Sequence, residues 1–298
     1  MKVSRSGYYK WLNEGPGPAE RARIDKEVRK VFWFHKRRYG QRRIGADLRD
    51  EGIKIGRCRI RSSMRRQGLV AIQPKSFRPK TTDSGHGRLA SPNLLKGLAE
   101  GADVLVGDIT YVPTRKDGWV YLAKFQNRET KRVVGWKMSK SLEAGIVIGA
   151  LRNAIETGHA RAGTIVHTDR GSQYVDDDYR ALFKKHGLRQ SMSAKGNCYE
   201  NAQAESFFAR YKVELLEGGV FEDFDEAVSE TFSYIDGYYN IHRRHSGIGY
   251  MTPAGYERKK KSEEDSVQSP FQYPGPSESS LRLQKTKIRR KMSEGCVH

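Results

Sequence analysis

The sequence predicts an α/β protein in which a mixed-sheet core follows a small helical domain. Three observations lead to this fold class. The positive charge is concentrated at the two ends of the chain, the first 70 residues show helical periodicity, and short β-branched strands alternate with helices from about residue 100. At 298 residues the chain is long enough for two domains with at least one substantial core.

The basic charge is distributed unevenly along the chain. Residues 1–96 carry 25 basic and 8 acidic side chains, residues 97–257 carry 20 and 22, and residues 258–298 carry 10 and 5. Basic arms around a nearly neutral core suit a polyanionic partner such as nucleic acid. A merely soluble basic protein is the alternative, but a uniform solubility charge would not stop at residue 96.

Residues 1–72 are predicted to form a helical domain. Apolar residues recur at helical spacing in the segments 24–34, 41–49 and 57–67, and Gly52 ends the second helix. Two short helices, a glycine-containing turn and a basic third helix predict a helix-turn-helix domain that binds DNA. The third helix supplies the candidate DNA-binding residues Arg57, Arg59, Arg61 and Arg65. A small bundle with a solvated basic surface is the alternative.

Residues 73–99 are rich in Pro, Gly, Ser and basic residues, and are predicted to be an extended basic linker. The core, 100–257, then begins with three strands joined by hairpin connections. Its predicted strands are 103–112, 119–127, 131–138, 163–167 and 188–192, and its predicted helices are 142–157, 176–186 and 201–216. The order β-β-β-α-β-α-β-α is that of the ribonuclease H-like fold, a mixed sheet flanked by helices.

A helical extension, 224–239, is predicted to end the core, followed by a run that mixes aromatic and basic residues. Such a mixture suits phosphate contact and base stacking, which makes Arg243, Arg244 and His245 candidate DNA-binding residues. A packed helix with a polar rim explains the same pattern equally well. Residues 258–298 are poor in apolar residues and carry two basic runs, so a disordered basic tail is expected.

The three cysteines show neither pairing nor metal-ligand spacing, which argues against a disulfide framework and a zinc site. The chain shows no signal-peptide pattern and no run of 18 apolar residues, so the expected location is the cytoplasm, away from membranes.

Carboxylates in three separate motifs suggest a site for a pair of divalent metal ions, which performs phosphoryl transfer on nucleic acid. Asp108 lies within an apolar strand, where an unpaired carboxylate is costly. Asp103 is an odd number of residues away and is expected on the other sheet face. Asp169 directly follows a short strand. In the last core helix Glu200 and Glu205 compete, and helix geometry alone leaves that choice open.

Several long motifs bear on that choice. They are SRSGYYKW, YGQRRIGADLRDEG, TTDSGH, GDITYVP, HTDRGSQY, SMSAKGNCYENAQAESFF and YNIHRRHSGIGYMTP. Over about residues 5–256 the chain resembles the catalytic second reading frame (OrfB) of transposases of the third insertion-sequence family. These belong with retroviral integrases to the DDE superfamily. The resemblance implies the metal ligands Asp108, Asp169 and Glu205. Gly107 departs from the usual Thr or Ser, and Tyr199-Glu200 from the common Trp-Asp.

The resemblance also implies an activity: metal-dependent DNA strand cleavage and strand transfer at insertion-sequence ends, with two Mg²⁺ ions for which Mn²⁺ substitutes. The implied partners are double-stranded DNA, further copies of the chain in a dimer or higher oligomer, and the upstream reading-frame product OrfA or its fusion. A purely hydrolytic nuclease or resolvase and a non-catalytic DNA-binding regulator are the alternatives.

Three residues around the start of the last core helix, Lys195, Asn197 and Asn201, are expected to contact DNA near the scissile phosphate. For Asn201 a helix N-cap is an equal alternative. His167, two residues before Asp169, could face the metal site, but a satisfied core histidine is the more common outcome.

Overall fold

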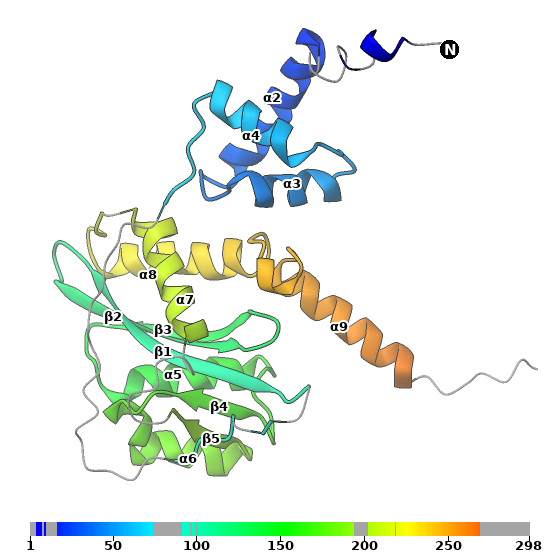
Figure 1. Cartoon of the computed structure of the whole chain (residues 1–298). Helices are drawn as coiled ribbons and strands as arrows, with labels where there is room; N and C mark the ends of the chain where they lie inside the picture. The colour runs from blue at the N-terminus through cyan, green and yellow to red at the C-terminus, as the bar shows by residue number, and fades with distance from the viewer. Residues whose placement is uncertain are drawn as a thin grey trace, which may run out of the picture. The chain divides into compact units, whose positions relative to one another are not determined.

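A computed structural model describes residues 4–7, 9, 17–73, 91–95, 97–98, 101–193, 202–217 and 219–268. The chain forms two units, Met1–Gly255 and Tyr256–His298 (Figure 1). The helices are α2 (Pro18–Phe34), α3 (Gln41–Asp50), α4 (Arg57–Arg66), α5 (Ala144–Glu156), α6 (Asp177–His186), α7 (Ala202–Tyr211), α8 (Phe224–Phe232) and α9 (Pro253–Gln268). The strands are β1 (Val104–Pro113), β2 (Trp119–Asn127), β3 (Val133–Ser139), β4 (Ile165–Thr168) and β5 (Arg189–Met192). Single turns η1 (Ser172–Val175) and η5 (Ser246–Ile248) and wider π-type turns η3 (Lys212–Leu216) and η4 (Ser233–Tyr239) complete the list.

The three N-terminal helices pack around their own apolar core, as their periodicity predicted. Ile24, Val28, Ile44, Leu48 and Ile60 are buried in one cluster. Because these residues repeat every three or four positions, each helix turns one apolar stripe inward and leaves its polar face to solvent. The helix-turn-helix prediction is therefore confirmed as an arrangement of helices.

The core is a five-stranded mixed sheet in the order β3-β2-β1-β4-β5. β1, β2 and β3 are antiparallel neighbours, while β4 and β5 pair parallel to β1 and to each other. The antiparallel first three strands and the mixed sheet agree with the layout that the sequence predicted. The boundaries of all five strands agree with the prediction to within two residues.

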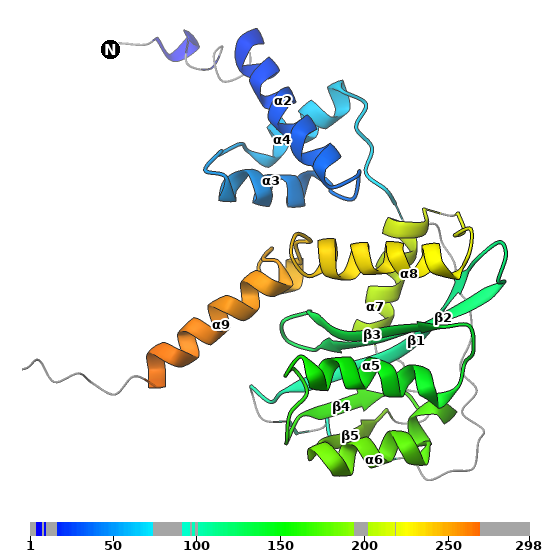
Figure 2. The same ribbon diagram turned by 180° about the vertical axis from the view of Figure 1, so that it is seen from behind.

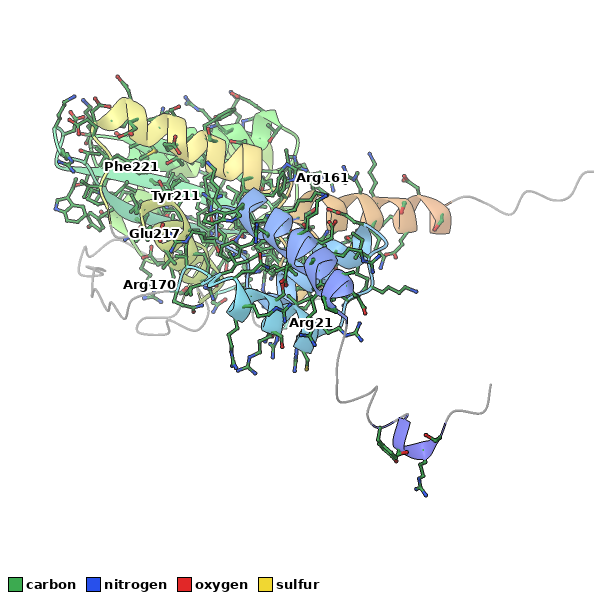
Figure 3. All side chains as sticks on the ribbon, turned by 90° about the horizontal axis from the view of Figure 1, so that it is seen from above. Arg21, Arg161, Arg170, Tyr211, Glu217 and Phe221 are labelled. Atoms are coloured by element: carbon green, nitrogen blue, oxygen red, sulfur yellow. The ribbon has the colours of Figure 1, made fainter. Side chains whose placement is uncertain are left out.

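The sheet is covered by different helices on its two faces, as Figures 1 and 2 show. α5 and α6 pack on one face over Leu105, Phe125 and Val166. α5 approaches β3 so closely that a Cβ added at Gly135 would collide with the backbone of Ala150. α7, α8 and η4 pack on the other face in a second cluster, which contains Tyr211 and Phe221 (labelled in Figure 3).

Two segments differ from the prediction. Leu94, Leu95 and Leu98, which fall in the predicted linker, pack against Val104 and Val106 because apolar side chains there lower their exposure by covering the sheet. Residues 258–268, expected to be disordered, continue helix α9. The remaining linker, 74–90, and the tail, 269–298, lie outside the described residues. Within the described residues we find no helix that is both long and apolar enough to cross a membrane.

Candidate active site and DNA-contacting residues

Asp108 lies on the sheet face covered by α7, at the gap between two apolar clusters. The same face of β1 carries Val104 and Val106 in one cluster and Val112 in the other. Side chains alternate along a strand, so Asp108 points to this face. Its Oδ1 accepts a hydrogen bond of 2.9 Å from the N–H of Ile109. The prediction of a carboxylate within an apolar strand is confirmed.

Asp169 reaches the same place through the parallel pairing of β1 and β4. Val106 pairs with His167, and each carboxylate follows its strand partner by two residues. Equal steps along parallel strands keep residues level, so Asp108 in the middle of β1 and Asp169 just past the end of β4 are expected near each other on one face of the sheet. Asp169 Oδ1 accepts from the N–H of Gly171 at 3.0 Å. Gly171 has an ordinary φ of −59°, so what it contributes is space beside the Asp169 carboxylate.

Helix α7 brings a third element to this face, since it packs on β1. Phe207 and Phe208 are buried in the α7 cluster. Burial lowers the pKa of Lys212, one turn further along, and the negative charge of Asp108 opposes that shift. Position 205 lies three residues before Phe208 and seven before Lys212, on the same side of the helix. The Glu205 side chain lies outside the described residues, as does Glu200.

A buried lysine on β2, Lys124, is the register partner of Asp108. It is fully buried and stands opposite Asp108 in the β1–β2 register. Burial lowers the pKa of its amine to about 7, although Asp108 acts in the opposite direction. Nothing in the sequence reasoning singled out Lys124 or Lys212. The signal was present: a lysine within an apolar strand is as unusual as an aspartate there.

Carboxylates are the oxygen ligands that Mg²⁺ and similar hard cations prefer, so Asp108 and Asp169 are chemically suited to hold a divalent metal. Among the described side chains, which exclude Glu205, no group of three metal-ligating residues is present. His167 is a satisfied core histidine, fully buried between the hydroxyls of Ser191 (2.8 Å) and Ser193 (3.0 Å). The predicted DNA contacts Lys195, Asn197 and Asn201 lie outside the described residues.

The basic helix α4 presents an exposed arginine row. Arg57, Arg61 and Arg65 are solvent-exposed, and no ion pair to them is present within the described residues. Arg59 pairs with Glu20 of α2 at 2.8 Å. Both partners are about half exposed, and an exposed pair of this kind contributes under about 1 kcal/mol, so a phosphate can replace Glu20.

Arg243 requires a correction, because it is buried and engaged. Only 2% of it is exposed, and it forms two hydrogen bonds, of 2.8 and 2.6 Å, with the buried carboxylate of Glu214. Tyr234 donates a third hydrogen bond to the same carboxylate. This guanidinium is buried and paired inside the fold and is not placed to contact DNA. The packed-helix alternative was right at this position.

His245, also a candidate DNA contact, is held inside the same region. Its ring packs edge-on against Tyr239, with ring centroids 4.9 Å apart. Burial and the neighbouring guanidinium groups of Arg243 and Arg43 lower the pKa of its imidazole to about 2. A neutral, partly buried imidazole offers no charge to a phosphate, so the predicted DNA contact of His245 stays a prediction without a positive charge behind it.

Arg244, the third candidate of that run, binds the helical domain. Its Nε donates to Asp47 Oδ1 at 2.6 Å and its backbone N–H donates to the hydroxyl of Tyr39 at 2.8 Å. The other oxygen of Asp47 lies 3.0 Å from Nε2 of the buried His35. The prediction of an Arg244–DNA contact is therefore not supported: this guanidinium joins α3 to the core. Sequence reasoning missed His35, Tyr39 and Asp47, because their partners are about 200 residues away.

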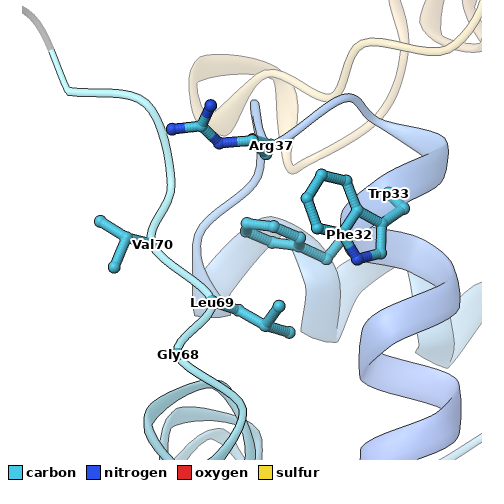
Figure 4. A pocket seen from close by; sticks show the side chains of 6 residues that line it. All are labelled: Phe32, Trp33, Arg37, Gly68, Leu69 and Val70. Atoms are coloured by element: carbon cyan, nitrogen blue, oxygen red, sulfur yellow. The ribbon is translucent and has the colours of Figure 1, made fainter.

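The helical domain also carries an open hollow, drawn in Figure 4. It has a volume of about 330 Å³ and is lined by Phe32, Trp33, Arg37, Gly68, Leu69 and Val70. None of these residues belongs to the carboxylate site, and nothing in the structure shows what covers the hollow.

Family models match most of the chain. A model described as "HTH-like domain" matches residues 19–77, and two models described as "Integrase core domain" match residues 100–198 and 186–253. Among solved structures, a simian T-cell lymphotropic virus intasome in complex with a PP2A regulatory subunit is 17% identical, with a TM-score of 0.43 over 84% of this chain and 77% of that chain. The catalytic core of BIV integrase is 20% identical, with a TM-score of 0.39 over 56% of this chain and all of that one.

Curated relatives match nearly end to end. The transposase InsF of insertion sequence IS3A from Escherichia coli is 39% identical over 266 residues, which are 87% of this chain and 92% of that protein. An uncharacterized 31 kDa protein of insertion element IS600 from Shigella sonnei is 38% identical over 86% of this chain and 96% of its own. The transposase of IS904 from Lactococcus lactis is 37% identical over 80% and 95%. With its integrase core between a helix-turn-helix domain and a packed helical extension, the chain belongs to the IS3 family of insertion-sequence transposases.

Proposed function

We propose that the protein is a DDE transposase that cleaves and joins DNA strands at the ends of an insertion sequence, with Asp108, Asp169 and Glu205 as its metal ligands. The observation that supports the proposal is the register of β1 against β4, in which Asp108 and Asp169 each follow a paired residue by two positions, together with the packing of α7 on β1. Transposases with an integrase core are polynucleotidyl transferases, so the chemistry is phosphoryl transfer.

The residues divide the work by position. Asp108 and Asp169 would bind the metal ions from two adjacent strands, and Glu205 would complete the metal site from α7. These carboxylates would hold two Mg²⁺ ions, for which Mn²⁺ would substitute, and the ions would supply activation of the attacking hydroxyl and stabilisation of the leaving oxygen. Lys212, within electrostatic reach of Asp108, attracts the DNA phosphate to the carboxylates. No covalent bond between protein and DNA is needed.

The remaining residues deliver the substrate. The exposed row Arg57, Arg61 and Arg65 binds duplex DNA through phosphate contacts. Lys195, Asn197 and Asn201 contact the strand near the scissile phosphate. Two element ends must meet for joining, so we infer a dimer or larger assembly on DNA, working with the upstream reading-frame product or its fusion in the cytoplasm.

The decisive experiment is Mg²⁺-dependent cleavage and strand joining of a native element end, with and without the upstream partner. Asp108→Asn, Asp169→Asn and Glu205→Gln should each lower both activities by at least about a thousandfold, because each removes a ligand of the metals that stabilise the transition state. Asp177→Asn on the exposed start of α6 and Glu200→Gln are the controls. If Glu200→Gln abolishes activity and Glu205→Gln does not, the third ligand is misassigned. If cleavage occurs without joining of pre-cleaved ends, the protein is a nuclease.

A further inference from the structure

Lys124 occupies an unusual environment directly beside Asp108. The two residues are register partners on β1 and β2, so they share a sheet face, and directly opposite Cβ atoms stand about 5 Å apart. Lys124 is 0% exposed. Its Nζ donates to Gln126 Oε1 at 3.1 Å and lies 5.1 and 5.7 Å from the ring centroids of Phe207 and Phe208.

The charge of this lysine has one acidic counterpart. Among the described residues its neighbours are a neutral amide, two aromatic rings and Asp108, and Asp108 alone is negative. Taking an ammonium group out of water is costly unless an opposite charge compensates. The surrounding cluster, with Leu122 and Val112, would accept a methionine of similar length at no such cost. A role in packing alone therefore does not explain the amine.

We propose that Lys124 is a built-in counter-cation of the metal site, which balances Asp108 before an ion binds and opposes the ion that Asp108 holds. The inference rests on the proposed function, because it takes Asp108 as a metal ligand. The protonated amine, as the register partner of Asp108, repels a cation held there and weakens ion binding to the free protein. The phosphates of bound DNA offset that charge. Lys124 thus makes metal binding depend on DNA.

Lys137 offers a matched control. It belongs to the neighbouring strand β3 and is exposed, and it lies on the opposite face, where a Cβ added at Gly149 of α5 would meet its side chain. Lys137→Met removes the same unit of charge from the same sheet without touching the carboxylate face. Lys124→Gln is a second test variant, which removes the charge but keeps a donor for Gln126.

The experiment measures Mn²⁺ binding to the full chain by electron paramagnetic resonance at pH 6.5, first without DNA and then with element-end DNA. Lys124→Met and Lys124→Gln should each bind Mn²⁺ at least about tenfold more tightly than wild type without DNA, because one like charge near the ion is gone. The increase in Mn²⁺ affinity on adding DNA should be smaller in both variants than in the wild type. Lys137→Met should match wild type, and melting curves in a chelator identify any variant that does not fold.

The outcomes separate the two proposals. If Asp108→Asn leaves Mn²⁺ binding unchanged, the metal site itself is wrong. If Asp108→Asn abolishes binding while folded Lys124→Met or Lys124→Gln binds Mn²⁺ no more tightly than wild type, the counter-cation inference is overturned and the metal site stands.

Discussion

Arg244 Nε lies 2.6 Å from Asp47 Oδ1, which joins the segment after η4 to helix α3 across 197 positions of the chain. The same carboxylate binds His35, whose ring stacks on Tyr39 at 3.6 Å between centroids. Tyr39 in turn donates to the backbone carbonyl of His242. The helical domain is therefore held on the core by mutually dependent polar contacts that are largely sheltered from water.

Arg244→Ala should lower the free energy of unfolding by about 1–3 kcal/mol, because it leaves the half-buried Asp47 without its guanidinium partner. Urea denaturation measures the change. Arg49→Ala removes an exposed arginine from α3 and should change stability by less than about 0.5 kcal/mol. Equal losses for the two variants would contradict the Arg244 contact.

Glu214→Gln should destabilise the core strongly, by about 3–5 kcal/mol, since it strands the buried charge of Arg243. The double variant Glu214→Leu, Arg243→Met removes both charges and should recover much of that loss. A double-mutant cycle in urea measures the coupling. If Arg243→Met keeps the stability of the wild type but loses affinity for DNA, the interpretation of Arg243 as a DNA contact is restored.

His245 should make the protein lose stability as pH falls below about 6.5. Its folded pKa is lowered to about 2 by burial and nearby guanidinium groups, so below the ordinary histidine pKa the unfolded chain binds a proton that the native state does not. The slope should approach about 1.4 kcal/mol per pH unit between pH 6 and 5. His245→Gln should remove this slope and the exposed His242→Gln should retain it, as followed by denaturation at several pH values.

Alanine at Arg57, Arg61 or Arg65 should weaken binding to DNA of any sequence. Each lost phosphate contact should reduce the slope of log affinity against log salt by about 1. Arg49→Ala is the comparison, because Arg49 lies on α3, outside the α4 row. Fluorescence anisotropy across a salt series measures both quantities, and unchanged slopes in all three row variants would exclude α4 as the DNA-facing helix.

Gly107→Ser should destabilise the fold by about 1–3 kcal/mol. A Cβ at this position would collide with the ring of Phe125, which fills the space behind β1. Adding Phe125→Val should relieve the clash and recover stability in thermal unfolding. No recovery would mean that another neighbour, such as Thr168, limits the position.

The order of helices and strands follows from the sequence alone, because each element carries its own period of apolar residues. It also singled out Asp108 and Asp169, since a carboxylate within or directly after an apolar strand is locally conspicuous. Glu205 needed the resemblance, because spacing on one helix cannot name a partner on a strand.

The availability of each basic residue to DNA, by contrast, follows from the fold. In the sequence, the run Arg243, Arg244 and His245 resembles a phosphate-binding segment. In the fold, Glu214 pairs with Arg243 and Asp47 pairs with Arg244, and both acids come from distant parts of the chain. The pairing of Lys124 with Asp108 likewise depends on strand register. The residue type gives the sign of a charge, whereas the burial of that charge and its ion-pair partner depend on the fold.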